Sequence, residues 1–215
     1  MCVCPKVTTT PKLFTMKRIL FSLLWIVYIP FANAQTTGFT LSLEQAVEVM
    51  MSGRSAMKNK VFFYINDTKA KSQSEQQGMK MNVFYFDSTK AMYTVVNIGG
   101  QKQVMVQKEA ILSVNKKYKS MEVRYQDELK EIVGTICKKA ILILEANSEK
   151  EEKVIWYDPD IVLPFKYNFG VPGLELIKGL PMEYENSQMG LLMKHSVIKK
   201  ELNSSIAPDI FNMEK

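Results

Sequence analysis

The sequence predicts a mainly β protein built on one large antiparallel sheet that curves into a barrel or an open half-barrel. Three observations support this class. Apolar and polar residues alternate along a long segment near residue 40, and short β-rich runs then follow one another with polar turns between them. Long helices do not alternate with these runs, which excludes a doubly wound α/β fold.

The chain begins with the pattern of a secretory signal peptide. Lys17 and Arg18 precede an apolar run of about a dozen residues, and the run closes on Ala32-Asn33-Ala34. The run is shorter than the roughly 20 residues that a membrane-spanning helix needs. We therefore expect translation to start at Met16, residues 1–34 to be an upstream extension and signal peptide, and cleavage to occur near Ala34/Gln35. The product would be periplasmic or secreted and would not span the membrane.

The charge of the mature chain is close to balanced. Removing residues 1–34 takes away four basic residues and no acidic one, which lowers the net charge from +6 to +2. The basic character of the whole chain therefore gives little support to a nucleic-acid partner, and we expect none. The remaining stretch, 35–215, is long enough for a single domain with its own core and needs no disulfide.

The first expected element is a long strand over residues 39–52. Six of its seven odd positions are apolar, and five of its seven even positions are polar. A helix is the rival interpretation, because Ser42 and Gln45 could form a capping box over an apolar stripe. The regular alternation favours the strand.

A meander of short strands is expected next, joined by turn-like segments such as "NIGGQK". The β-rich runs lie at residues 60–67, 68–75, 79–87, 90–97, 102–107, 109–115 and 118–125. Residues 126–132, "QDELKEI", are expected to form one or two helical turns. Residues 135–145 and 152–160 then form a hairpin with a charged tip.

The last third of the chain starts with an irregular stretch. Residues 159–181 contain four prolines and three glycines, which resist regular structure, and the stretch is a candidate flap over the open edge of the sheet. Two strands follow at 182–187 and 191–203, with a turn near Gly190 and a tail at 206–215.

A curved sheet of about eleven or twelve such strands encloses space. Methionine and aromatic residues are interleaved on several strands, and methionine suits an apolar cavity with an imprecise ligand. The alternative is that these side chains simply fill the core. The candidate ligand-lining residues are Met81, Val83, Tyr85, Tyr93, Trp156 and Tyr157.

Three short motifs resemble a family of secreted proteins of unknown function of the Bacteroidota type, related to the GLPGLI family and grouped with the LolA-like outer-membrane lipoprotein carriers. The likeness is best over residues 79–211. The motifs are a Gly-x-x-Cys-Lys-Lys strand, a Trp-Tyr-x-Pro turn and a Gly-Leu-Pro-Leu-Glu-Tyr strand. They match Gly134, Cys137, Lys138 and Lys139, then Trp156, Tyr157 and Pro159, then Gly179, Leu180, Pro181, Glu183 and Tyr184.

This sequence departs from the last motif at Met182, where the family has leucine, and its GLPGLI motif is broken into "GVPGLEL" and "GLPMEYE". The resemblance implies an antiparallel LolA-like half-barrel with short helical lid segments over an apolar concave face. In the lipoprotein carriers that face holds acyl chains. Transfer of ligand binding to this chain rests on the likeness of fold.

Few residues have the pattern of a catalytic or metal site. Cys137 is the one cysteine of the mature chain and His195 the one histidine, and neither lies in a nucleophile motif. We expect the thiol to pack as a small apolar side chain, with a mixed disulfide or covalent dimer as the alternative. Asp158 and Asp160 flank a proline, which favours a turn over a metal site.

The sequence thus predicts a periplasmic, non-catalytic binding protein for a lipid or other apolar ligand, with no cofactor and no bound metal. Specificity would be loose, as suits a carrier. The alternative is a structural or protein-interaction module of the cell envelope. In that case side chains would fill the barrel, and an exposed strand edge or the flap would bind a protein partner.

Overall fold

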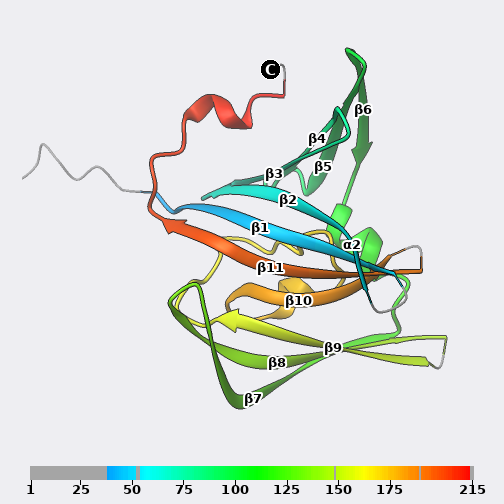
Figure 1. Cartoon of the computed structure of the whole chain (residues 1–215), viewed down its shortest axis with the longest axis vertical. Coiled ribbons are helices and arrows are strands. Elements are labelled where there is room, and N and C mark those ends of the chain that lie inside the picture. Colours follow the sequence, from blue (N-terminus) through cyan, green and yellow to red (C-terminus); the bar gives the residue numbers. More distant parts are fainter. Residues whose placement is uncertain (1–37, 52–53, 148, 189, 214–215) are drawn as a thin grey trace, which may run out of the picture. The chain divides into compact units, whose positions relative to one another are not determined.

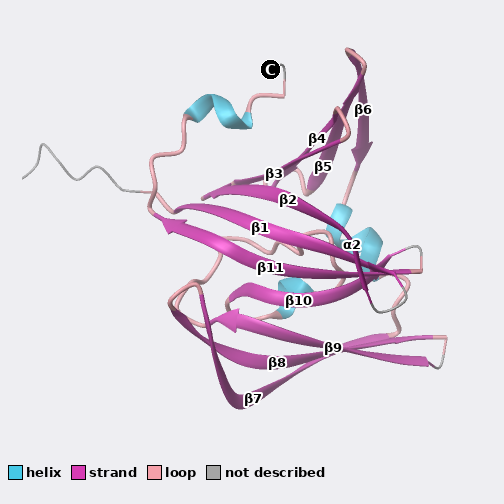
Figure 2. Ribbon diagram, in the orientation of Figure 1, coloured by secondary structure: helices cyan, strands magenta, loops and turns pink. Residues whose placement is uncertain are grey.

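The computed structural model describes residues 38–213, apart from 52–53, 148 and 189. The expected start at Met16, the signal peptide and its cleavage site lie outside these residues. Figures 1 and 2 show one antiparallel sheet in the described part. Its strands are β1 (Thr40–Met51), β2 (Arg54–Asn66), β3 (Lys69–Gln76), β4 (Met79–Phe86), β5 (Ala91–Ile98), β6 (Gln101–Gln107), β7 (Ser120–Ile132), β8 (Thr135–Ala146), β9 (Glu149–Asp158), β10 (Leu180–Gln188) and β11 (Leu191–Leu202).

The sheet is open and consists of two meanders. Its order is β6-β5-β4-β3-β2-β1-β11-β10-β9-β8-β7, so every neighbouring pair is consecutive in the chain except β1 and β11. These two strands join the halves, and β6 and β7 are left as the free edges (Figure 1). The predicted class, an antiparallel open half-barrel with few helices, is confirmed.

Strand β1 owes its position to its alternating pattern. Leu41, Leu43, Gln45 and Val47 are buried, and the residues between them are half-buried. The strand pairs with β2 on one side and with β11 on the other, so its backbone groups are satisfied along both edges. The structure therefore confirms the strand and excludes the helix that a capping box at Ser42 would have begun.

Two local predictions are wrong. Residues 109–115, expected as a strand, contain helix α2 (Ala110–Asn115), which Glu109 starts in the left-handed region at φ 48°. Residues 126–132, expected as helical turns, form the second half of β7, which bulges between Gln126 and Leu129. Pairing with β8 overrides the helix propensity of the charged residues there, and the bulge absorbs two extra residues.

The irregular stretch between β9 and β10 packs on one face of the sheet. Phe169 lies edge-on to Phe63 of β2 with ring centroids 5.3 Å apart, and Phe165 stacks on Tyr85 of β4 at 5.6 Å. Its buried branched-aliphatic and aromatic residues are Ile161, Phe165, Tyr167, Phe169, Val171, Leu174 and Ile177. We call residues 159–179 the inner segment. The flap expected at the open edge is thus largely part of the core.

The helical elements are short. Besides α2, the described residues form two 3-10 helices, η1 (Leu174–Leu176) in the inner segment and η2 (Pro208–Phe211) near the C-terminus. The side chain of Phe211 is buried, and Lys102 of β6 donates a hydrogen bond of 2.7 Å to the carbonyl of Met213. No helix within the described residues has the length and apolar character needed to cross a membrane.

Candidate functional site

An apolar hollow lies between helix α2, the end of β4, the start of β7 and the inner segment. Its volume is about 630 Å³, which is within the range of small-molecule sites. Most of its exposed lining is apolar. The apolar residues that line it are Tyr85, Ile111, Leu112, Met121, Pro164, Phe165 and Leu176. We call this hollow the apolar cavity.

Local chain geometry creates the apolar cavity. Strand β6 ends at Gln107, and the chain crosses to the far edge of the sheet through α2. The first backbone N–H of this helix donates to the carbonyl of Lys90 at 3.1 Å. The opposite wall is aromatic, because Tyr85 stacks on Phe165 and lies 5.7 Å from the ring of Tyr167. The wall is therefore a packed cluster of rings, and α2 forms a short cover.

The cavity lining also contains charged and amide side chains. Lys90 and Asp87 form an ion pair at 2.5 Å. The side chain of Asn115 donates a hydrogen bond to Oε1 of Glu175. Burial raises the pKa of Tyr85 above its usual value, and the charge of Asp87 adds to the effect, so this hydroxyl stays protonated.

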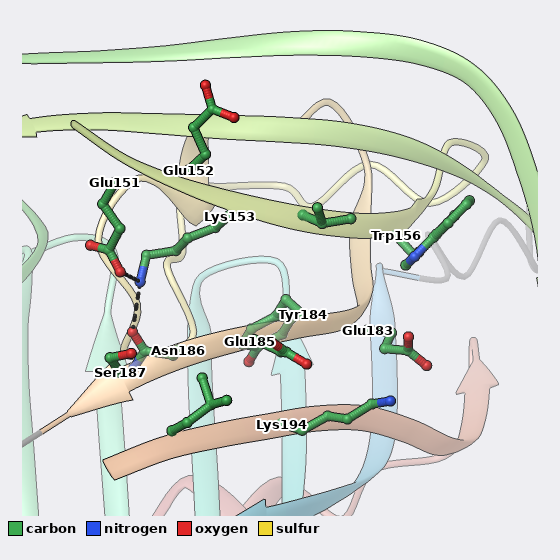
Figure 3. A pocket seen from close by; sticks show the side chains of 12 residues that line it. Glu151, Glu152, Lys153, Trp156, Glu183, Tyr184, Glu185, Asn186, Ser187 and Lys194 are labelled. Carbon is green, nitrogen blue, oxygen red and sulfur yellow. Dashed lines mark hydrogen bonds and ion pairs between the residues drawn. The ribbon is translucent and has the colours of Figure 1, made fainter. Parts of the chain in front are cut away.

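A second hollow, of about 400 Å³, lies among β9, β10 and β11 (Figure 3). The β9–β10 ladder ends at the pair Ile155–Tyr184, and beyond it the two strands separate. The buried Lys153 spans the opening, donating to Oδ1 of Asn186 at 3.1 Å and pairing with Glu151 at 2.7 Å. Lys153 thus joins β9 to β10 where main-chain pairing stops.

A third hollow of about 540 Å³ is lined by the inner segment and its continuation into β10. It shares five residues with the apolar cavity: Pro164, Phe165, Lys166, Glu175 and Leu176. The inner segment therefore borders two neighbouring hollows, and the apolar cavity is the one that also has a helix and two strands as walls.

The structure brings only some of the predicted lining residues to hollows. Tyr85 lines the apolar cavity, and Trp156 lines the polar hollow between β9 and β10. Tyr157 is buried, with its ring 5.6 Å from that of Tyr125. These three side chains thus lie in three different surroundings.

The other three predicted residues lie away from the hollows described. Met81 and Val83 share the face of Tyr85 by alternation along β4, but Met81 is 38% exposed. Tyr93 pairs with Phe84, and its ring lies edge-on to Phe86, so it belongs to the opposite face. The six residues do not form one site.

Sequence reasoning missed most of the apolar cavity. Ile111 and Leu112 lie in the run that was expected to be a strand, and Phe165 and Leu176 lie in the stretch that was expected to be a flap. The apolar residues of the irregular stretch were the available signal, because a solvated loop has little reason to carry so many.

Cys137 and His195 are not a catalytic pair in this structure. They lie on β8 and β11, with β9 and β10 between them in the sheet. Burial, together with the charge of Asp158, raises the pKa of the Cys137 thiol to about 11. Burial lowers the pKa of His195 to about 4, and its Nδ1 lies 3.1 Å from Oε1 of Gln45.

The two aspartates around Pro159 act in a turn and an ion pair. Oδ1 of Asp158 accepts the N–H of Asp160 at 3.0 Å, and its Oδ2 lies 2.5 Å from Nζ of Lys200. The part of the chain that the structure describes contains no group of three or more His, Cys, Asp or Glu residues that could hold a metal ion.

Comparisons with solved structures give distant likenesses. No family model matches the chain, and no curated protein matches it. Among solved structures it is similar to LprF from Mycobacterium bovis, with 10% identity over 77% of this chain and 87% of that one and a TM-score of 0.34. It is also similar to a beta-barrel-like protein of the domain of unknown function DUF1849 from Brucella abortus, with 7% identity over 76% and 97% and a TM-score of 0.32.

Proposed function

We propose that the protein is a periplasmic, non-catalytic binding protein for a lipid or another apolar ligand, and that the ligand occupies the apolar cavity. The observation that carries this proposal is a hollow of about 630 Å³ whose exposed lining is mostly apolar. The predicted signal peptide supports the location. The site differs from the six residues expected from the sequence, because the inner segment already covers the sheet face that carries Tyr85.

Binding would come from removing acyl or alkyl surface from water against Ile111, Met121 and Leu176. Each buried methylene is worth about 0.8 kcal/mol. Leu112 lines the cavity although 55% of its side chain is exposed, so a ligand would cover apolar surface that otherwise faces solvent. An alkyl chain held mainly by such contacts is bound with loose specificity, as suits a carrier.

Native mass spectrometry with organic extraction tests the proposal. The protein is purified from the cell envelope without detergent, and its mass is compared with that of the bare chain. We expect an adduct of lipid mass, or uptake of an added alkyl ligand. A bare chain that takes up neither fatty acid, phospholipid nor any other alkyl ligand would contradict the proposal.

A matched pair of variants places the ligand. Leu112→Glu puts a carboxylate into the cavity, so the lipid adduct should be lost. Because Leu112 is exposed, the variant should still fold. Leu129→Glu makes the same change on β7 at a side chain that is 62% exposed and lies outside the cavity. It should keep the adduct. Equal loss in both variants would argue against this site.

The free edge of β6 favours a second candidate function, a protein-interaction module of the envelope. Val104, Met105 and Val106 follow one another on this strand and are each more than half exposed. Edge strands of this kind pair with other chains unless charges or proline protect them, and β6 has one charged residue in seven. A partner that co-purifies with the wild type and is lost in Val104→Lys, without any lipid adduct, would favour this candidate.

A further inference from the structure

Two acceptor oxygens beside the apolar cavity have no hydrogen-bond partner in the described structure. They are Oδ1 of Asn115 and Oε2 of Glu175, and both atoms are buried. The two side chains line the cavity and are already joined, since Nδ2 of Asn115 donates to Oε1 of Glu175. That bond fixes the amide orientation, because a flipped amide would place two oxygens against each other. Both unsatisfied atoms are therefore acceptors.

A ligand that satisfies this pair must donate hydrogen bonds. A carboxylate head has no N–H or O–H to give and would lie against the carboxylate of Glu175. A hydroxyl donates one hydrogen bond, whereas a primary ammonium donates three and needs no donor in return. Its positive charge also matches Glu175, and hydrogen bonds to charged groups are the stronger kind.

The other charged side chains of the cavity leave this preference in place. The lining includes three acidic residues, Asp87, Glu109 and Glu175, and two basic ones, Lys90 and Lys166. Lys90 is paired with Asp87, so one positive and one negative charge already offset each other. The remaining lining carries two carboxylates against one ammonium, which favours a cationic head.

We propose that the apolar cavity takes a single-chain amphiphile with a primary amine head, whose ammonium group is held by Glu175 and Asn115 at the junction of α2 and η1. The inference rests on the proposed function and names the chemical class of its ligand. Cavity walls formed by Phe165, Met121 and Leu176 would hold the alkyl chain of the ligand. The two acceptor oxygens would select its head group.

Three ligands of one chain length separate the head from the chain. Dodecylamine, dodecanol and dodecanoate are titrated against the purified protein by displacement of the fluorescent probe N-phenylnaphthylamine. We expect dodecylamine to bind about tenfold more tightly than dodecanol, and dodecanoate to bind most weakly. Equal affinities, or a preference for dodecanoate, would overturn the amine proposal and leave apolar binding intact. No displacement by any of the three would count against the proposed function itself.

Glu175→Gln tests the residue directly, with Glu122→Gln as the control. The first variant removes the acceptor and the charge in the cavity, and the second removes the same charge from an exposed ion pair on β7. We expect the affinity for dodecylamine to fall about tenfold in Glu175→Gln only, and the affinity for dodecanol to change less than about twofold in both. An unchanged amine preference in Glu175→Gln would refute the assignment. The ranking in the wild type needs no variant, so it decides the case even if Glu175→Gln folds poorly.

Discussion

Gly173 of the inner segment lies directly against Leu142 of β8. A Cβ built on Gly173 would come within 2.9 Å of Cδ1 of Leu142, and the backbone there is left-handed with φ +80°. Both the space and the conformation therefore favour glycine. This contact fixes the inner segment on the sheet, and the segment in turn forms one wall of the apolar cavity.

Gly173→Ala is expected to destabilise the protein strongly, and Gly170→Ala is its matched control. Gly170 has φ +77° but no heavy atom within 4 Å of an added Cβ, so alanine there costs only the left-handed conformation, about 1–2 kcal/mol. Alanine at 173 adds overpacking against Leu142, and its cost should be about 1–3 kcal/mol larger. Urea unfolding measures both. Equal costs would show that the inner segment is not packed against β8.

Lys200→Met should lower the free energy of unfolding by about 3–5 kcal/mol, because it leaves the carboxylate of Asp158 buried without its ammonium partner. Asp158 is 1% exposed, and Lys200 also donates to Oγ1 of Thr135 at 2.7 Å. Lys199→Met removes a neighbouring lysine from an exposed pair with Glu201 and should change stability by less than about 1 kcal/mol.

The double variant Lys200→Met with Asp158→Asn isolates the pair. Asparagine keeps an oxygen for the turn at Asp160 and removes the buried charge, so the double change should cost less than the sum of the two single changes. Additive costs in chemical denaturation would show that the pair is not coupled.

His195 should make stability depend on acid pH. Burial lowers its folded pKa to about 4 from an ordinary value of 6.5, so the unfolded chain binds more protons between these values. The contribution of the neutral His195 to the free energy of unfolding is fully present above pH 6.5. It is lost as the pH falls toward 4, at up to about 1.4 kcal/mol per pH unit. His195→Phe keeps an aromatic ring beside Tyr184 and should flatten this slope. An identical pH profile in the variant would contradict the buried imidazole.

The Cys137 thiol should resist modification in the folded protein. Its side chain is 0% exposed, and a pKa of about 11 leaves roughly 0.1% thiolate at pH 8. Reaction of the mature protein with Ellman's reagent is expected to follow the rate of global unfolding and to be fast in guanidinium chloride. Rapid labelling without denaturant would show an accessible thiol instead.

The sheet was largely predictable because its strands carry local signals. The alternation along β1 predicts a strand, and the turn residues between β2 and β6 predict turns, each from only a few neighbouring residues. Helix α2 was not predictable in this way, because six residues with apolar Ile111 and Leu112 fit a buried strand as well as a short helix. The second half of β7 was also misassigned, since its pairing with β8 is a long-range property.

Most of the apolar cavity could not be predicted from the sequence. Tyr85 was expected to line a ligand site and lines the apolar cavity, but its stacking partner Phe165 is 80 positions away in a stretch without a regular period. The pairing of Asn115 with Glu175 likewise joins α2 to η1 over a separation of 60 residues. Contacts of this kind follow from packing of the inner segment, and local pattern does not encode them.

A crystal structure with a dodecyl alcohol brominated at its far end would test the central claim most directly, because bromine marks the position of the chain and the neutral head leaves the amine proposal aside. We predict an anomalous bromine peak inside the apolar cavity, among Met121, Phe165 and Leu176. Bromine found only on the exposed β6 edge, or at no ordered position, would contradict the cavity as the ligand site.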